Sequence, residues 1–131
     1  MNIMPTVNTT KLVNILSKDL SYNPQGKAEF HKEAKKVLKA VADKLGLSKG
    51  EFDLRSNVGG IAGSGEVTLH TDRLYLTLSQ GVCGNSTNQM YRACNGRKDS
   101  RGGTNQWIDV SRLLDDAVIA RFEKIQDSQT A

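Results

Sequence analysis

The chain has 131 residues, about the length of one domain, and 37% of them are hydrophobic, which is enough for a folded core. Lysine and arginine exceed aspartate and glutamate by four charges, which favours an anionic partner. No stretch approaches the roughly 18 apolar residues of a membrane-spanning helix, and no secretory signal pattern opens the sequence. We therefore expect one α+β domain over residues 1–131, located in the cytoplasm, where its two cysteines are reduced thiols.

Two amphipathic helices are predicted in the first part of the chain. The first is capped by Thr9 or Thr10 and runs to about Leu20, with leucines at helical spacing. The second runs from Lys27 to Leu45, and Gly46 supplies the left-handed residue that commonly ends a helix. Its apolar residues form one continuous stripe: Phe30, Ala34, Val37, Leu38, Val41 and Leu45. Its lysines lie off the stripe, as on a solvated face.

A glycine-rich segment, residues 57–65, follows a short predicted strand at residues 52–56. It looks like a phosphate-binding loop, but such loops lead from a strand into a helix, whereas here a strand follows. We interpret the segment as a tight connection or bulge with positive-φ glycines. A loop that faces a ligand is the alternative.

A β-hairpin is predicted over residues 66–79, with its turn at Thr71 and Asp72, because apolar and polar residues alternate in both halves. One face is aliphatic and is expected to pack on the stripe of the second helix. This face consists of Val67, Leu69, Leu74, Leu76 and Leu78. The other face carries His70, Arg73 and Tyr75.

Residues 81–107 are the segment in which we expect the function to lie, because long polar loops in compact domains are usually functional or disordered. Its apolar residues argue against disorder. We expect a glycine-rich loop that contains a strand at 89–94 and ends at Trp107, interpreted as a core anchor, with a binding aromatic as the alternative. A last helix is predicted from Val110 to about Gln126, capped by Asp109. Its apolar stripe is Val110, Leu113, Leu114, Ala117, Val118 and Ile125.

This loop concentrates groups that bind anions and bases. Arginine presents a planar fork to phosphate or carboxylate, glycines let backbone amides approach an anion, amides can contact base edges, and tyrosine can stack. The predicted binding residues are Tyr91, Arg92, Asn95, Arg97, Lys98, Arg101, Asn105 and Gln106. The alternative is a solubilising loop in which Arg97 or Lys98 pairs with Asp99.

Catalytic and metal-binding patterns are incomplete. Cys83, Cys94 and His70 could supply three zinc ligands, but there is no Cys-x-x-Cys pair. A cysteine nucleophile would need His31 or His70 as its base, and reduced buried cysteines mostly behave as small apolar residues. Ser64 lacks the full Gly-x-Ser-x-Gly pattern. Asp115 and Asp116 are adjacent, diverge on a helix, and suit its dipole. We assign no catalytic residue, metal or cofactor.

Several fragments between residues 55 and 107 carry a family resemblance. They include Arg-Ser-Asn-Val-Gly-Gly-Ile-Ala, Gly-Glu-Val-Thr-Leu-His, Met-Tyr-Arg-Ala-Cys-Asn-Gly-Arg-Lys-Asp and Gly-Gly-Thr-Asn-Gln-Trp. This region, under half of the chain, resembles small conserved proteins of tailed bacteriophages. The resemblance implies a small early phage protein, often a non-enzymatic binder that disarms a host enzyme or immune system. It carries over no functional residue.

The expected architecture is α+β: two N-terminal helices, an antiparallel sheet with a central hairpin, a glycine-rich loop and a C-terminal helix. The expected function is that of a non-enzymatic phage-type inhibitor, a host-takeover or anti-defence factor. Its basic loop would contact an anionic target, such as nucleic acid, a nucleotide or the nucleic-acid site of a host protein. A sequence-nonspecific nucleic-acid-binding protein is the first alternative, and a small cysteine- or metal-dependent hydrolase or nuclease is the second. The oligomeric state stays open, with a homodimer possible.

Overall fold

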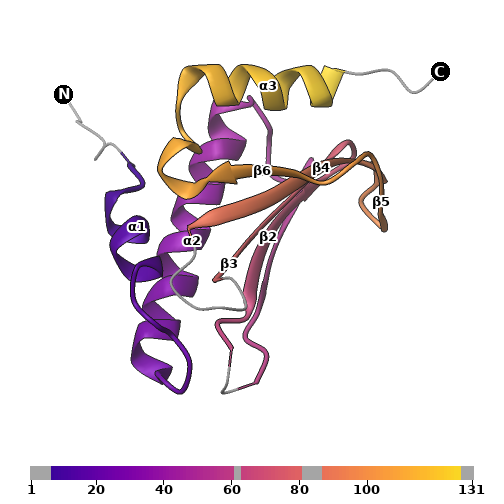
Figure 1. The fold of residues 1–131 in the computed structure, drawn as a ribbon. Coiled ribbons are helices and arrows are strands. Elements are labelled where there is room, and N and C mark those ends of the chain that lie inside the picture. The colour runs from indigo at the N-terminus through magenta and orange to yellow at the C-terminus, as the bar shows by residue number, and fades with distance from the viewer. Residues whose placement is uncertain (1–6, 61–62, 81–86, 128–131) are drawn as a thin grey trace.

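The computed structural model describes residues 7–60, 63–80 and 87–127, and these residues form three α-helices and an antiparallel six-stranded sheet (Figure 1). The α+β class is therefore confirmed. The helices α1 and α2 stand along one side of the sheet, and α3 crosses one end of it (Figure 1). The opposite side of β2 and β3 carries no described helix.

Helix α1, Thr10–Leu16, is shorter than the sequence pattern predicts. In a longer helix, the amide of Leu20 would donate to the carbonyl of Leu16. Here the side chain of Gln80 forms hydrogen bonds with both groups instead. The Gln80 amide nitrogen donates to Leu16 O at 3.1 Å, and the Gln80 amide oxygen accepts from Leu20 N at 2.9 Å. Leu20 is still buried, as its spacing suggests, but it lies on the turn that follows the helix.

Helix α2, Pro24–Lys44, begins three residues earlier than expected. Asn23 caps it by accepting a hydrogen bond from Gly26 N at 3.0 Å, and proline suits the first helical position. The end is as predicted. Gly46 has φ +73°, its amide donates to Asp43 O, and Leu47 N donates to Ala42 O, which together form a Schellman motif.

The sheet has the order β1-β2-β3-β4, and β4 then pairs with both β5 and β6. Every pairing is antiparallel. The strands are β1 Phe52–Asn57, β2 Glu66–Thr71, β3 Leu74–Ser79, β4 Asn88–Gly96, β5 Asp99–Gly102 and β6 Gln106–Asp109. The expected strand at 89–94 is thus part of a longer one, and the part of 81–107 that the structure describes contains three strands where a glycine-rich loop was expected.

The core lies between α2 and the sheet. The aliphatic residues of β2 and β3 and the stripe of α2 belong to one cluster of buried side chains. Leu69, Leu76, Phe30 and Leu38 are all completely buried. This arrangement follows from the two sequence periods, because alternate residues of a strand and every third or fourth residue of a helix share a face.

The C-terminal helix is interrupted, contrary to the single helix expected from Val110. A 3₁₀ turn, η1 (Val110–Arg112), comes first, and Asp109 caps it by accepting from Ser111 N at 3.0 Å. Helix α3 then spans Asp116–Asp127. The interruption changes the phase of the apolar stripe. Ile119 and Phe122 become buried, whereas Ala117 is exposed.

The first prediction tests the burial of the β3 leucines in the core that they share with α2. Leu76→Ala should lower the free energy of unfolding by about 2–5 kcal/mol, because it leaves a cavity in a fully buried layer. Ser79→Ala, on the same strand but facing the other way, should change it by less than about 0.5 kcal/mol. Urea denaturation measures both. A loss below about 0.5 kcal/mol in Leu76→Ala would show that the faces of β3 are reversed.

The second prediction concerns the end of the glycine-rich segment. Gly65 has φ +69°, and a Cβ built there would lie 2.3 Å from Asn57 O. Gly65→Ala should therefore lower the free energy of unfolding by about 1–3 kcal/mol. Gly63 is the matched control, since nothing lies within 4 Å of the position of its Cβ. Thermal denaturation measures both variants, and a melting temperature of Gly63→Ala equal to or lower than that of Gly65→Ala would contradict this geometry.

Candidate functional site

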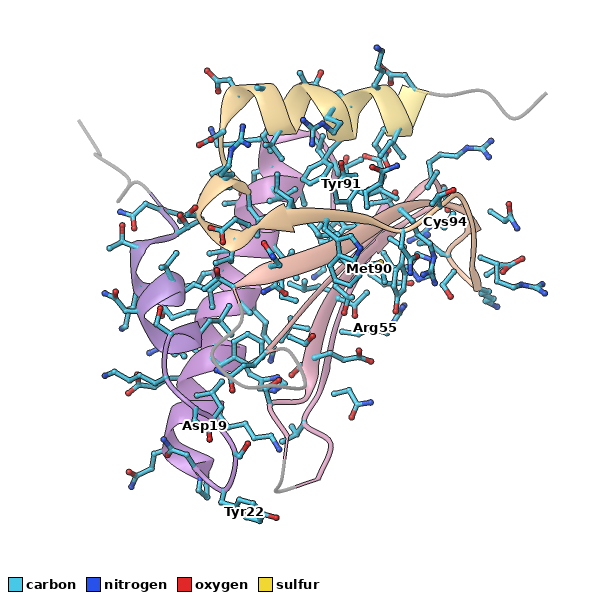
Figure 2. The ribbon with its side chains drawn as sticks, in the orientation of Figure 1. Asp19, Tyr22, Arg55, Met90, Tyr91 and Cys94 are labelled. Carbon is cyan, nitrogen blue, oxygen red and sulfur yellow. The ribbon has the colours of Figure 1, made fainter. Side chains whose placement is uncertain are left out.

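The side of the sheet that faces away from the helices, called the open face below, carries two rows of side chains. Strand pairing aligns one row across β1, β2, β3, β4 and β6, and directly paired residues point to the same side of a sheet. This outer row is Arg55, Thr68, Thr77, Met90 and Trp107. The neighbouring inner row is Asp53, His70, Tyr75 and Arg92. Figure 2 shows Arg55 and Met90 on this side of β4, and Tyr91 on the other side, beneath α3.

The outer row ends in an exposed tryptophan. Trp107 is 64% exposed and pairs with the partly buried Met90. The interpretation of Trp107 as a core anchor is therefore wrong, because adjacent residues of a strand face opposite sides and Ile108 takes the core position. Within the row, Thr68 and Thr77 are buried and share a hydrogen bond of 3.0 Å. One end of the outer row, Met90 and Trp107, is therefore apolar and aromatic. The threonines in its middle are polar, but their hydroxyl groups are hydrogen-bonded to each other.

The inner row is a stack of rings and a guanidinium group. The His70 and Tyr75 rings meet edge to face with centroids 5.2 Å apart, and the Arg92 guanidinium lies 4.7 Å from the Tyr75 ring centroid. Cation–π contacts of this length are attractive. Arg92 also donates to Ser100 O at 2.6 Å and to the Asn105 side-chain oxygen at 2.9 Å. It therefore joins β4 to β5 and to the segment before β6.

His70 is neutral and holds two parts of the site together. It is only 2% exposed. Its Nε2 lies 2.7 Å from Gly96 O and must donate, since a carbonyl only accepts. Its Nδ1 lies 2.8 Å from Arg55 Nη2 and must accept, since arginine only donates. Burial is the main cause that lowers the pKa of His70, and the positive charge of Arg55 acts in the same direction.

Most predicted cations at the end of the sheet are already paired. Arg97 contacts Asp72 at 3.1 Å and Asp53 at 3.9 Å. Arg101 contacts Asp99 at 2.9 Å, and the hydrogen bond from Arg101 is the main cause that holds the pKa of Asp99 well below its usual range. The predicted alternative, in which Arg97 or Lys98 pairs with Asp99, is therefore wrong, because Arg101 pairs with Asp99 and Arg97 pairs with Asp72 and Asp53.

The remaining predicted residues divide between the two sides of the sheet. Lys98 is exposed and forms no ion pair with any described residue. Asn95 donates to Asp99 at 3.2 Å. Tyr91 is 1% exposed and packs edge to face on Phe122, so it offers no surface for stacking. Gln106, opposite Tyr91 in the ladder, lines a hollow on the α3 side. Of the predicted binding residues, Arg92 and Asn105 thus lie on the open face. A binding role for Trp107 was only the alternative interpretation, and Arg55 and Met90 were not among the predicted residues.

The groups considered for catalysis are engaged in packing and backbone hydrogen bonds. Cys94 is buried, its Sγ lies 3.5 Å from Thr71 O, and burial raises the pKa of its thiol. Cys83 lies outside the described residues. The Ser64 hydroxyl donates to Gly65 O at 2.8 Å and accepts from Gln80 N at 2.9 Å. In residues 7–60, 63–80 and 87–127, no three histidine, cysteine, aspartate or glutamate side chains gather as metal ligands.

Comparison with known proteins adds no relative: no protein family, curated protein or solved structure matches this chain. Among the described helices, none has the length and apolar composition needed to cross a membrane. The open face itself is therefore the basis for a functional conclusion.

The third prediction concerns the pH dependence of folding. The pKa of His70 is lower in the folded protein than its ordinary value of about 6.5, so the neutral ring stabilises the fold. This stability is complete above about pH 6.5 and is lost as the pH falls through the folded-state pKa. His70→Gln should flatten the pH dependence of the free energy of unfolding in that window. Urea denaturation between neutral and mildly acidic pH measures it, and equal slopes in both proteins would contradict the assignment.

Proposed function

We propose that this protein is a non-catalytic binding protein whose open face holds single-stranded nucleic acid. The observation that carries this proposal is the exposure of Trp107 beside Met90, next to the stacked pair of Tyr75 and Arg92, on a sheet face that no described helix covers. Single-strand binders typically combine such aromatic platforms with positive charge.

The aromatic part of the site supports base stacking. An exposed tryptophan on the surface of a sheet can present its ring to a base, and stacking of a base on an aromatic ring contributes about 1–3 kcal/mol. Trp107 is the single tryptophan of the chain, and its cross-strand neighbour Met90 provides an adaptable apolar surface beside it. Unpaired bases can splay onto such a surface, whereas the bases of a duplex are stacked on each other.

The charge of the site supports phosphate binding. Among the described residues, six cations and five carboxylates lie on the open face, on β5 and on the two turns at its end, which Arg97 and Asp72 bring into contact. The cations are Arg55, Arg73, Arg92, Arg97, Lys98 and Arg101, and the carboxylates are Asp53, Glu66, Asp72, Asp99 and Asp109, which leaves a small positive excess. Because His70 is neutral, the positive excess comes from lysine and arginine and persists at neutral pH.

A second candidate follows from the mixture of charges. The ion pairs of Arg97 with Asp72 and Asp53 give this end of the face both signs, which suits an acidic patch on a protein partner. A phage inhibitor or host-takeover factor with this face would therefore bind an acidic patch of a host protein. A nucleic-acid site of a host protein fits less well, because such sites are themselves basic.

The fourth prediction uses Trp107 as its own reporter. An oligothymidylate of about 12 nucleotides, within the site sizes of single-domain binders, should quench the tryptophan fluorescence and bind with a dissociation constant below about 100 μM. A duplex of equal length should quench it less. Trp107→Phe keeps a ring and should retain most of the affinity, measured by anisotropy of a labelled oligonucleotide, whereas Trp107→Ala should lose about five- to 150-fold.

The salt dependence separates stacking from charge. Lys98→Ala should reduce the slope of log affinity against log salt by about 0.7, one released counterion on a single strand, while Trp107→Ala should leave the slope unchanged. Lys39, exposed on α2 and paired with Asp43, is the matched control. No quenching and no anisotropy change up to about 100 μM would refute nucleic-acid binding and leave the acidic protein surface as the candidate.

A further inference from the structure

A cavity of about 410 Å³ lies between the N-terminal turns of α2 and the glycine-rich connection of β1 to β2. It is lined by Pro24, Lys27, Ala28, His31, Val58 and Gly59. None of these residues belongs to the open face, so the cavity is a separate feature of the molecule. Its volume falls within the range of small-molecule sites.

The cavity contains a lysine that is nearly buried. Lys27 is 6% exposed, and its Nζ donates to Gly60 O at 2.6 Å. Across the ranges that the structure describes, no carboxylate lies within ion-pair distance of this nitrogen. An ammonium group has three donors, and a buried charge is costly unless it is paired. The single hydrogen bond to Gly60 O therefore leaves the positive charge of Lys27 unpaired and two of its N–H donors without an acceptor.

The histidine beside Lys27 does not supply the missing negative charge. His31 Nε2 lies 2.8 Å from Ser64 O and must donate to that carbonyl, and its Nδ1 lies 2.6 Å from Ser56 Oγ, from which it can accept. The ring carries no negative charge in any protonation state, and it fastens the two ends of the glycine-rich connection to α2. The other walls, Pro24, Ala28 and Val58, are apolar. Lys27 is the charged group of this lining.

We propose that this cavity binds a small anion with an apolar body, whose carboxylate or phosphate head pairs with Lys27. The head would take up the two free donors of Nζ, and the body would lie against Pro24, Ala28 and Val58. The N-terminal end of α2, a 21-residue helix, adds partial positive charge on the same side. The glycine-rich segment is then a ligand-facing loop as well as a tight connection.

The experiment compares ligands that share a body and differ in the head. Octanoate and octyl phosphate are titrated into the full-length protein, with octanol as the uncharged analogue and acetate and inorganic phosphate as heads without a body. Amide chemical shifts of Ala28, Val58 and Gly59 report binding at the cavity. At least one charged amphiphile should bind about tenfold or more tightly than octanol and than its own head group. The stronger of the two identifies the head.

Two variants test the role of Lys27. Lys27→Met keeps the buried stem, so it should fold with a melting temperature at or above that of the wild type and lose the preference for charged amphiphiles over octanol. Lys32→Met, at an exposed position of the same helix, should keep that preference. Val58→Glu places a negative charge at the exposed rim without a packing change and should weaken binding about two- to fivefold, against Val58→Thr as control.

Three results would overturn the proposal. The first is equal binding of octanol and the charged amphiphiles, which would make the cavity merely apolar. The second is an unchanged preference in Lys27→Met, or unchanged affinity in Val58→Glu if Lys27→Met does not fold. The third is an absence of shifts at Ala28, Val58 and Gly59 with every probe. None of these results bears on the open face, which the oligonucleotide experiment tests with different residues.

Discussion

The packing of α2 against the sheet, chiefly against β1 and β2, determines which side of the sheet is available for binding. Leu74, Leu76 and Leu78 are completely buried against the helical side, and strand alternation then forces Tyr75 and Thr77 to the opposite side. A register shift of one residue would exchange these two sets, and the hydrophobic penalty of exposing three leucines prevents it. The composition of the open face is thus a consequence of how the core is buried.

The open face also has a polar interior of its own. Thr68 and His70 are almost completely buried although no described helix covers them. Thr68 bonds to Thr77, and the His70 ring contacts Arg55 and Gly96, which precedes the turn between β4 and β5. The contact of His70 with Gly96 O and that of Arg92 with Ser100 O both bridge to this end of the sheet. Buried polar groups need such partners, so these bonds fix the position of β5 and of the segment that leads to Trp107.

Local periodicity explains which features could be predicted from the sequence. The stripe of α2 and the alternation of β2 and β3 repeat over many residues, so these elements and the core face were predicted correctly. Strands β5 and β6 have four residues each and little apolar alternation, and they exist because β4 is long enough to pair with both. The end of α1 depends on Gln80, more than 60 residues later. Trp107 could be oriented only from its register with Met90. Such nonlocal contacts leave no periodic pattern in a single sequence.

The candidate binding site was predicted in part for the same reason. Counting cations between residues 92 and 101 suggests a strongly basic loop, but Arg97 pairs with carboxylates of β1 and of the β2–β3 turn, and Arg101 pairs with one on its own strand. What matters for an anion is charge that the fold leaves uncompensated. By that measure the exposed Lys98 and the buried Lys27 indicate anion sites better than the paired arginines do. The two lysines lie in different parts of the fold. Water solvates an exposed cation, so the charge of Lys98 does not by itself require a bound partner. A buried cation without a carboxylate has no such compensation, and the environment of Lys27 is therefore the stronger argument for a specific ligand.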